Sequence, residues 1–149
     1  MIQKAERIIE AYQKVKPAGC GVIAMDGRAA AGKTTLAEEL AVTLGGAVVH
    51  MDDFFLPGEL RTPERLAAPG GNVHAERFAE EVLPYLRRGE AFRYRRFDCH
   101  RMDYNGWVEI PPVPVIIVEG AYSQHPRFGG YADLTVFCDI APVSYTHLT

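Results

Sequence analysis

The sequence predicts an α/β fold built on a doubly wound parallel sheet. Four apolar runs indicate buried strands, at residues 20–25, 47–51, 113–118 and 134–138. Helical segments and loops separate these runs, and strands separated by helices pair in parallel with helices on both faces of the sheet. A glycine-rich loop between the first strand and the next helix favours the same fold.

The first predicted element is an amphipathic helix at the N-terminus. Its apolar side chains recur at helical spacing: Ile2, Ala5, Ile8, Ile9, Tyr12 and Val15. Pro17 and Gly19 end this helix before the first strand. We expect it to pack on the sheet.

The loop after the first strand meets every fixed position of the phosphate-binding P-loop pattern. It reads Gly27-Arg28-Ala29-Ala30-Ala31-Gly32-Lys33-Thr34, and the helix that follows starts near Thr35. Glycines let the loop wrap a phosphate with its N–H groups pointing inward, and the helix N-terminus adds a positive dipole end. Lys33 can reach the β- and γ-phosphates, while the Thr34 hydroxyl is placed to ligate magnesium. Residues 27–35 therefore predict a nucleotide site, with an ordinary glycine turn as the alternative interpretation.

The segment after the second strand begins with a long loop and continues as a helix. Pro and Gly are frequent in residues 52–71, which indicates a loop. Asn72 is expected to cap a helix over residues 74–88, with a kink at Pro84.

A small hairpin is predicted as an insertion beside the main sheet. Residues 92–97 and 107–110 indicate two short strands, and Asn105-Gly106 is a dipeptide favoured in tight turns. The whole pattern predicts a P-loop NTPase, with a doubly wound parallel sheet, helices on both faces and a β-hairpin insertion.

Composition excludes several classes of function. The 149 residues are 48% hydrophobic, enough for one core, so we expect a single domain over residues 1–149. A net charge of −3 gives no overall attraction for nucleic acid or an anionic membrane. Charged residues interrupt the first 15 positions, so we expect no signal peptide there and a cytoplasmic protein. The cysteines and histidines lack the spacing of a metal site. The sequence does not decide whether the protein forms a homo-oligomer.

Carboxylates follow three of the four predicted strands. Asp26 ends the first, Asp52 and Asp53 follow the second, and Glu119 ends the third. Ligands of such sheets collect beyond the carboxyl ends of the strands. A bare triphosphate would repel this cluster, but carboxylates can hold a divalent cation, and one of them can take the proton of an attacking hydroxyl.

Three motifs resemble the uridine kinase family of P-loop nucleoside kinases. They are Ile23-Ala24-Met25-Asp26-Gly27, His50-Met51-Asp52-Asp53-Phe54-Phe55 and Val115-Ile116-Ile117-Val118-Glu119-Gly120-Ala121-Tyr122. Phosphoribulokinase and bacterial pantothenate kinase share part of the pattern, which covers roughly residues 18–140. The resemblance implies that ATP and Mg²⁺ are the cofactors.

The resemblance also implies roles for the carboxylates. Asp52 matches the base for the nucleoside 5′-hydroxyl, with a loop cap as the alternative, and Asp53 is its neighbour. Glu119 matches the acid near magnesium, beside Thr34, or else caps the next turn. Asp26 is expected to hydrogen-bond the P-loop backbone or lysine.

The acceptor pocket is implied on the hairpin and the long loop. Four side chains match those around a pyrimidine base: Phe55, Tyr94, Phe97 and His100. An aromatic hairpin of this kind can equally be core. Many relatives place an Asp on the ribose hydroxyls in the region that aligns with residues 70–74, where this chain has no acid. Val73 cannot make that contact, and His74 could replace it only in part.

Arginines surround the same hairpin, at positions 93, 95, 96 and 101. They form either a solvated strand face or an attraction for an anionic acceptor, as a phosphoribulokinase-like enzyme would require.

The C-terminal segment departs from the family. Relatives continue beyond residue 140 into a helix, an arginine-bearing lid and a last strand. Residues 141–149 match none of these, so the lid and last strand are expected to be missing and the tail to be unrelated sequence.

The predicted function is ATP-dependent phosphorylation of the 5′-hydroxyl of uridine or cytidine, in nucleoside salvage. Lys33 and Asp52 are the predicted catalytic residues. One alternative is a kinase of another small-metabolite hydroxyl, and a second is a P-loop ATPase or switch without a small-molecule acceptor.

Overall fold

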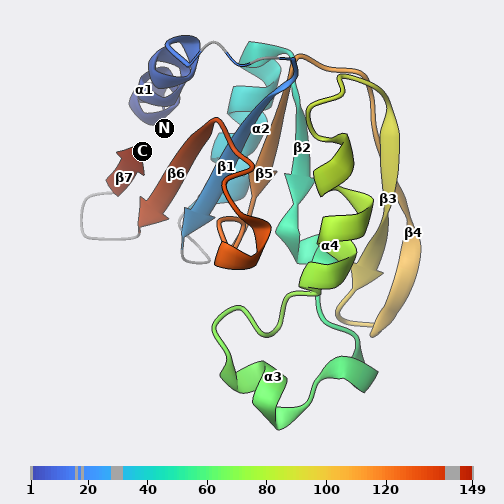
Figure 1. Cartoon of the computed structure of the whole chain (residues 1–149). Helices are drawn as coiled ribbons and strands as arrows, with labels where there is room; N and C mark the ends of the chain where they lie inside the picture. The colour runs from blue at the N-terminus through green and yellow to red at the C-terminus, as the bar shows by residue number, and fades with distance from the viewer. Residues whose placement is uncertain (1, 16, 18, 28–31, 140–144, 149) are drawn as a thin grey trace.

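Four parallel strands form the centre of the molecule (Figure 1). A computed structural model of the chain describes residues 2–15, 17, 19–27, 32–139 and 145–148. The strands lie in the order β2 (Ala47–His50), β5 (Val115–Glu119), β1 (Gly21–Gly27) and β6 (Leu134–Asp139). β7 (Tyr145–Leu148) pairs antiparallel with β6 at the edge. The predicted parallel α/β sheet is confirmed, and part of the tail expected to be unrelated adds a strand to it; residues 141–144 and 149 lie outside the described residues.

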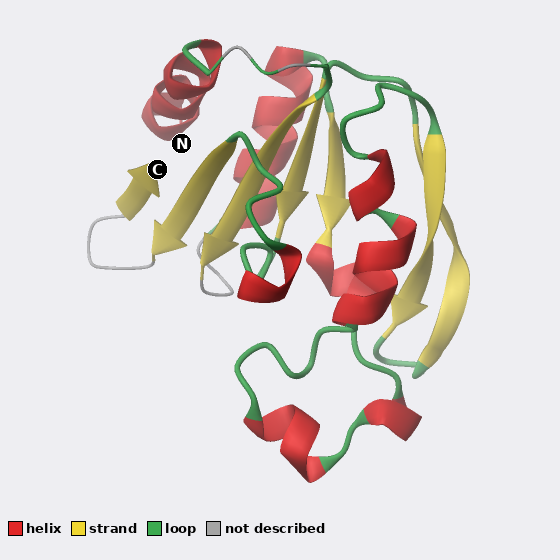
Figure 2. Cartoon of the chain, viewed as in Figure 1, coloured by secondary structure: helices red, strands yellow, loops and turns green. Residues whose placement is uncertain are grey.

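Both faces of the sheet are covered (Figure 2). The side chains of each strand alternate between the two faces, so each strand packs against elements on both sides. On one face, Val115 and Ile117 of β5 pack with α1 (Ile2–Gln13) and α2 (Lys33–Leu44). On the other face, Ile116 and Val118 pack with α4 (Ala75–Glu81) and the hairpin. No helix in the described part of the chain is long and apolar enough to cross a membrane.

The segment after β2 contains short helices, so the prediction of an uninterrupted loop over residues 52–71 is wrong. These helices are η1 (Met51–Phe54), η2 (Gly58–Leu60) and α3 (Pro63–Ala67). The Thr62 hydroxyl accepts a hydrogen bond from the Arg65 N–H and caps α3, whose first residue is a proline. This segment projects beyond the carboxyl edge of the sheet (Figure 1).

The helix predicted over residues 74–88 is divided in two. α4 ends at Glu81, and the 3₁₀ turn η3 (Leu83–Tyr85) follows, because Pro84 has no N–H to continue an α-helix. Asn72 does not cap α4. Its carbonyl accepts a hydrogen bond from the Leu56 N–H, and the N-cap position belongs to His74.

The hairpin forms a separate two-stranded sheet of β3 (Phe92–Asp98) and β4 (Asp103–Ile110). The insertion is confirmed, but its turn lies at residues 99–102 rather than at Asn105-Gly106. Arg95 pairs with Trp107, whereas Phe97 pairs with Tyr104, so β4 carries one extra residue. Gly106 has φ of 79° in this bulge, a conformation that glycine favours. The dipeptide therefore marks a bulge instead of a turn.

Candidate active site

The C-terminal end of the P-loop forms a pocket of about 270 Å³ with Asp52 of η1 and the end of β5. Gly32 has left-handed backbone angles at the start of α2, and Lys33 is buried behind it. The Lys33 ammonium donates to the Gly27 carbonyl over 2.8 Å. We call this the phosphate pocket; it is lined by Gly32, Lys33, Thr34, Thr35, Asp52, Glu119, Gly120 and Ala121. Arg28, Ala29, Ala30 and Ala31 lie outside the described residues.

Glu119 is the centre of a hydrogen-bond network at the base of this pocket. Its side chain is 4% exposed, and Oε1 accepts from the Thr34 hydroxyl at 3.2 Å and from His50 Nδ1 at 2.5 Å. His50 and Glu119 are register partners on neighbouring parallel strands, which places their side chains together. The Glu119 hydrogen bond raises the pKa of His50 against the opposing effect of burial. No role was predicted for His50. The pairing of β2 with β5, whose last residues are His50 and Glu119, would have indicated it.

Thr34 and Glu119 fit a magnesium ion bound together with phosphate. A hydroxyl and a carboxylate oxygen 3.2 Å apart are hard ligands of the type that Mg²⁺ prefers. Among the described residues, no group of three or more His, Cys, Asp or Glu side chains is placed to hold a metal. In nucleotide sites of this kind, phosphate oxygens and water usually supply the remaining ligands of Mg²⁺.

Asp52 and Asp53 serve different pockets. Asp52 is exposed and lines the phosphate pocket. Asp53 is half-buried on the hairpin side, where Oδ2 accepts from the Tyr94 hydroxyl at 2.9 Å. Burial raises the pKa of Asp53, although the Tyr94 hydrogen bond acts in the opposite direction.

A second pocket, of about 380 Å³, lies on the Asp53 side. We call it the hairpin pocket; it is lined by Asp53, Arg96, Phe97, Asp98, Cys99 and Asn105. The Phe97 ring stacks on Phe55, with ring centroids 6.4 Å apart, and the Arg61 guanidinium lies 4.5 Å from the Phe55 centroid. The structure thus brings two of the four predicted base-contacting residues together.

The other two occupy different environments. Tyr94 is fully buried, so it can influence an acceptor only through Asp53; burial raises the pKa of its phenol. His100 is exposed in the turn between β3 and β4, where its N–H bonds to Asp98. Neither residue lines the hairpin pocket.

The position implied for ribose recognition is occupied by an apolar side chain. Val73 is buried and pairs with Phe55 in an isolated bridge. His74 donates its backbone N–H to the Phe54 carbonyl at 2.7 Å, and burial lowers the pKa of its imidazole. Its Nδ1 atom is buried without a hydrogen-bond partner among the described residues.

Arg77 is a buried anchor that was not predicted from the sequence. It is 3% exposed, and its guanidinium donates to the Asp53 carbonyl at 2.5 Å and to the Arg95 carbonyl at 2.6 Å. The same group lies 4.1 Å from the Phe54 ring centroid. Arg77 therefore ties η1 to β3. A single basic residue on a helix gives no sequence signal for such a role.

The remaining charged candidates have structural partners. Asp26 accepts hydrogen bonds from the backbone N–H groups of Gly27, Tyr122 and Gln124, as expected for a residue that supports the P-loop backbone. Of the predicted arginine cluster, Arg95 pairs with Glu81 at 3.0 Å. Arg93 lies over the Trp107 ring. Of the four arginines in the cluster, only Arg96 lines the hairpin pocket.

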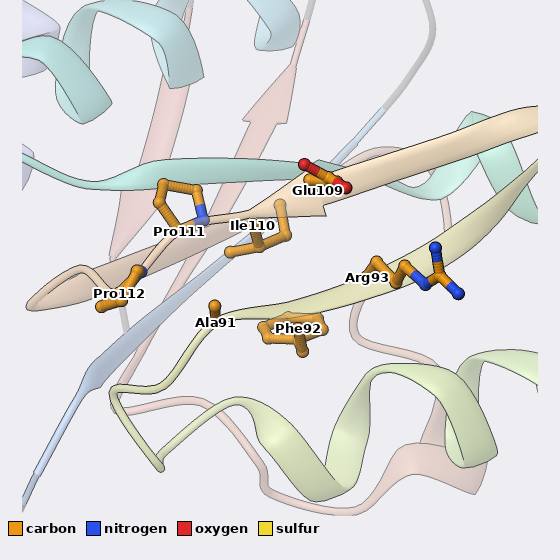
Figure 3. A pocket seen from close by; sticks show the side chains of 7 residues that line it. All are labelled: Ala91, Phe92, Arg93, Glu109, Ile110, Pro111 and Pro112. Carbon is orange, nitrogen blue, oxygen red and sulfur yellow. The ribbon is translucent and has the colours of Figure 1, made fainter.

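A further hollow of about 600 Å³ lies at the base of the hairpin (Figure 3). Residues 91–93 and 109–112 line it, with Phe92, Ile110 and two prolines among them. Arg93, of the predicted arginine cluster, also lines this hollow.

The fold is shared with P-loop kinases of known structure. A possible uridine kinase from Bacillus stearothermophilus matches with a TM-score of 0.76 and 21% identity, over 91% of this chain and 79% of that one. A protein named as a fructose transport system kinase, from Silicibacter sp. TM1040, matches with a TM-score of 0.70 and 25% identity, over 89% and 73%. No protein-family model matches the chain. The predicted resemblance to P-loop kinases is confirmed.

Proposed function

We propose that the protein transfers the γ-phosphoryl group of ATP to a hydroxyl of a small metabolite, with the 5′-hydroxyl of uridine or cytidine as the first candidate. One observation carries this proposal: Lys33, Thr34, Asp52 and Glu119 line a single pocket at the carboxyl edge of the sheet. The names of both structural neighbours, each a kinase, support it.

The residues of the phosphate pocket divide the work. Lys33 places a positive charge beside the phosphates at the start of α2, where backbone N–H groups also point toward an anion. Thr34 and Glu119 would hold Mg²⁺, directly or through water. Bound Mg²⁺ neutralises charge on the transferring phosphoryl group.

Asp52 is the proposed base. Its carboxylate is exposed in the pocket that contains Lys33 and Thr34, so an acceptor hydroxyl beside it can also face the γ-phosphate. As the acceptor oxygen bonds to phosphorus, its proton passes to the Asp52 carboxylate, and ADP leaves with the electron pair of the broken P–O bond.

A different small alcohol is the second candidate. Val73 is buried at the position where the resemblance implies a carboxylate for ribose, so that contact is not made from this position. One structural neighbour is named for fructose transport. A sugar is therefore a reasonable alternative acceptor, and an ATPase without an acceptor is the third candidate.

The test is transfer of labelled γ-phosphate from MgATP to uridine, cytidine, adenosine, fructose, ribulose 5-phosphate and pantothenate. We expect label on uridine or cytidine. Label on another acceptor would retain the kinase and reject the nucleoside. Release of label only as inorganic phosphate, equal with and without acceptors, would favour the ATPase.

A further inference from the structure

Two hydrogen bonds hold Asp53 in place beside the hairpin pocket. Its Oδ2 atom accepts from the Tyr94 hydroxyl, and its backbone carbonyl accepts from buried Arg77. Within the part of the chain that the structure describes, Oδ1 accepts no hydrogen bond. The carboxylate is thus fixed in position with one oxygen available, which lowers the entropic cost of binding a ligand.

The polar groups of this pocket select the chemistry of a ligand. A carboxylate only accepts hydrogen bonds and a guanidinium only donates them, so Asp53 and Arg96 together suit groups that do both. Hydroxyl groups meet this requirement. The pocket contains the carboxylates of Asp53 and Asp98 against the single cation Arg96, so a phosphorylated or carboxylate ligand would be repelled.

Two of the surrounding arginines have contacts outside this pocket. Arg95 is paired with Glu81, and Arg93 lies on Trp107. The chain also lacks a carboxylate at position 73, where Val73 is buried beside Phe55. Asp53 follows Asp52 directly in the sequence, and it lines the hairpin pocket.

We propose that Asp53 recognises the hydroxyl groups of an uncharged, polyhydroxylated acceptor such as the ribose of a nucleoside, and that Tyr94 and Arg77 position it for this contact. This inference rests on the proposed function. It assigns the two adjacent aspartates to different tasks, with Asp52 as the base and Asp53 as the specificity residue.

The test compares Asp53→Asn with the wild-type protein on uridine, 2′-deoxyuridine and 3′-deoxyuridine. We expect Asp53→Asn to lower kcat/KM for uridine on the order of 10- to 100-fold, the usual value of a hydrogen bond to a charged group. The preference for uridine over the deoxy analogue that lacks the contacted hydroxyl should shrink by a similar factor. The KM for MgATP should not change.

Two variants guard against a purely structural explanation. Tyr94→Phe keeps the buried ring and removes the bond to Asp53, so it should reduce the same preference by a smaller factor. Asp103→Asn, an exposed hairpin residue, should leave it unchanged. Melting temperatures of all variants are measured alongside.

The outcomes separate this inference from the proposed function. A uridine-to-deoxyuridine ratio that Asp53→Asn leaves unchanged would overturn the inference while the kinase stands. If wild-type protein phosphorylates fructose instead, the same ratio is measured with its deoxy forms and decides the inference in the same way. Calorimetric titration covers the case without turnover: wild-type protein that binds uridine and both deoxy analogues equally, or binds none of them, overturns the inference.

Discussion

The two ends of the candidate site are built in different ways. At the phosphate end, Thr34, His50 and Glu119 come from elements of one sheet and its first crossover, and strand register aligns them. At the acceptor end, the hairpin is a separate sheet whose position depends on side chains such as Arg77 and Tyr94. In the proposed function, the backbone therefore sets the phosphate chemistry and a few side-chain anchors set acceptor recognition, so the two should respond separately to mutation.

Among changes confined to one end of the site, the largest effect should come from removing the P-loop lysine. Lys33→Ala deletes the charge beside the transferring phosphoryl group, and we expect transfer to slow by about 10²- to 10³-fold, as for loss of one stabilising donor. Uridine affinity, measured by calorimetry, should stay unchanged. A variant that loses uridine binding as well would show that the two ends are not separable.

Loss of Arg77 should affect the other end. Arg77→Met leaves the Asp53 and Arg95 carbonyls without their buried donor, so the free energy of unfolding should fall by about 3 kcal/mol. Acceptor affinity should weaken and MgADP affinity should not. Urea denaturation and the two titrations check this, with exposed Arg88→Met as the control. A stability loss of equal size in the control would argue against the anchoring role.

A smaller effect is expected from the histidine behind Glu119. His50→Ala removes the hydrogen bond that orients this carboxylate, and we expect Mg²⁺-dependent binding of ADP to weaken by roughly 10- to 100-fold. ADP binding without Mg²⁺ should be unaffected. His50→Gln, which retains an N–H donor, should recover part of the loss. Equal weakening with and without Mg²⁺ would assign His50 a general structural role.

The smallest effect concerns the ion pair that ties α3 to α4. A hydrogen bond from Arg65 to the Glu76 carboxylate lowers the pKa of Glu76 to about 2, below the ordinary value of 4.5. A depressed carboxyl pKa stabilises the folded state above pH 4.5 and loses this contribution as the pH falls toward 2. Glu76 is 43% exposed, so the contribution should not exceed about 1 kcal/mol. Unfolding of Glu76→Gln between pH 5 and 2 should show a correspondingly flatter pH dependence; an identical slope would contradict the pairing.

The same contrast explains what the sequence could predict. The P-loop pattern, the four strands and the carboxylates that follow them could be predicted from the sequence, because each is a local pattern with a fixed place in a parallel sheet. The turn of the hairpin and the helices of the long loop were missed. Asn105-Gly106 signals a positive φ, and only the pairing of Phe97 with Tyr104 shows that this conformation is used in a bulge.

The same difference applies to the candidate site, where contacts between side chains distant in the sequence could not be predicted. Arg77 and the bond between Tyr94 and Asp53 join residues 18 to 41 positions apart without any strand register between them, so no local pattern indicates them.

The most direct test of the account is single-turnover transfer by Asp52→Asn with MgATP and the acceptor both saturating. Asp52 lines the phosphate pocket and directly precedes Asp53 of the hairpin pocket, and its variant keeps the size of the side chain but cannot accept a proton. We predict that both ligands bind with dissociation constants within about twofold of wild type, while transfer slows by about 10²- to 10⁴-fold. Transfer at the wild-type rate would contradict the placement of the base and, with it, the division of the site into two ends.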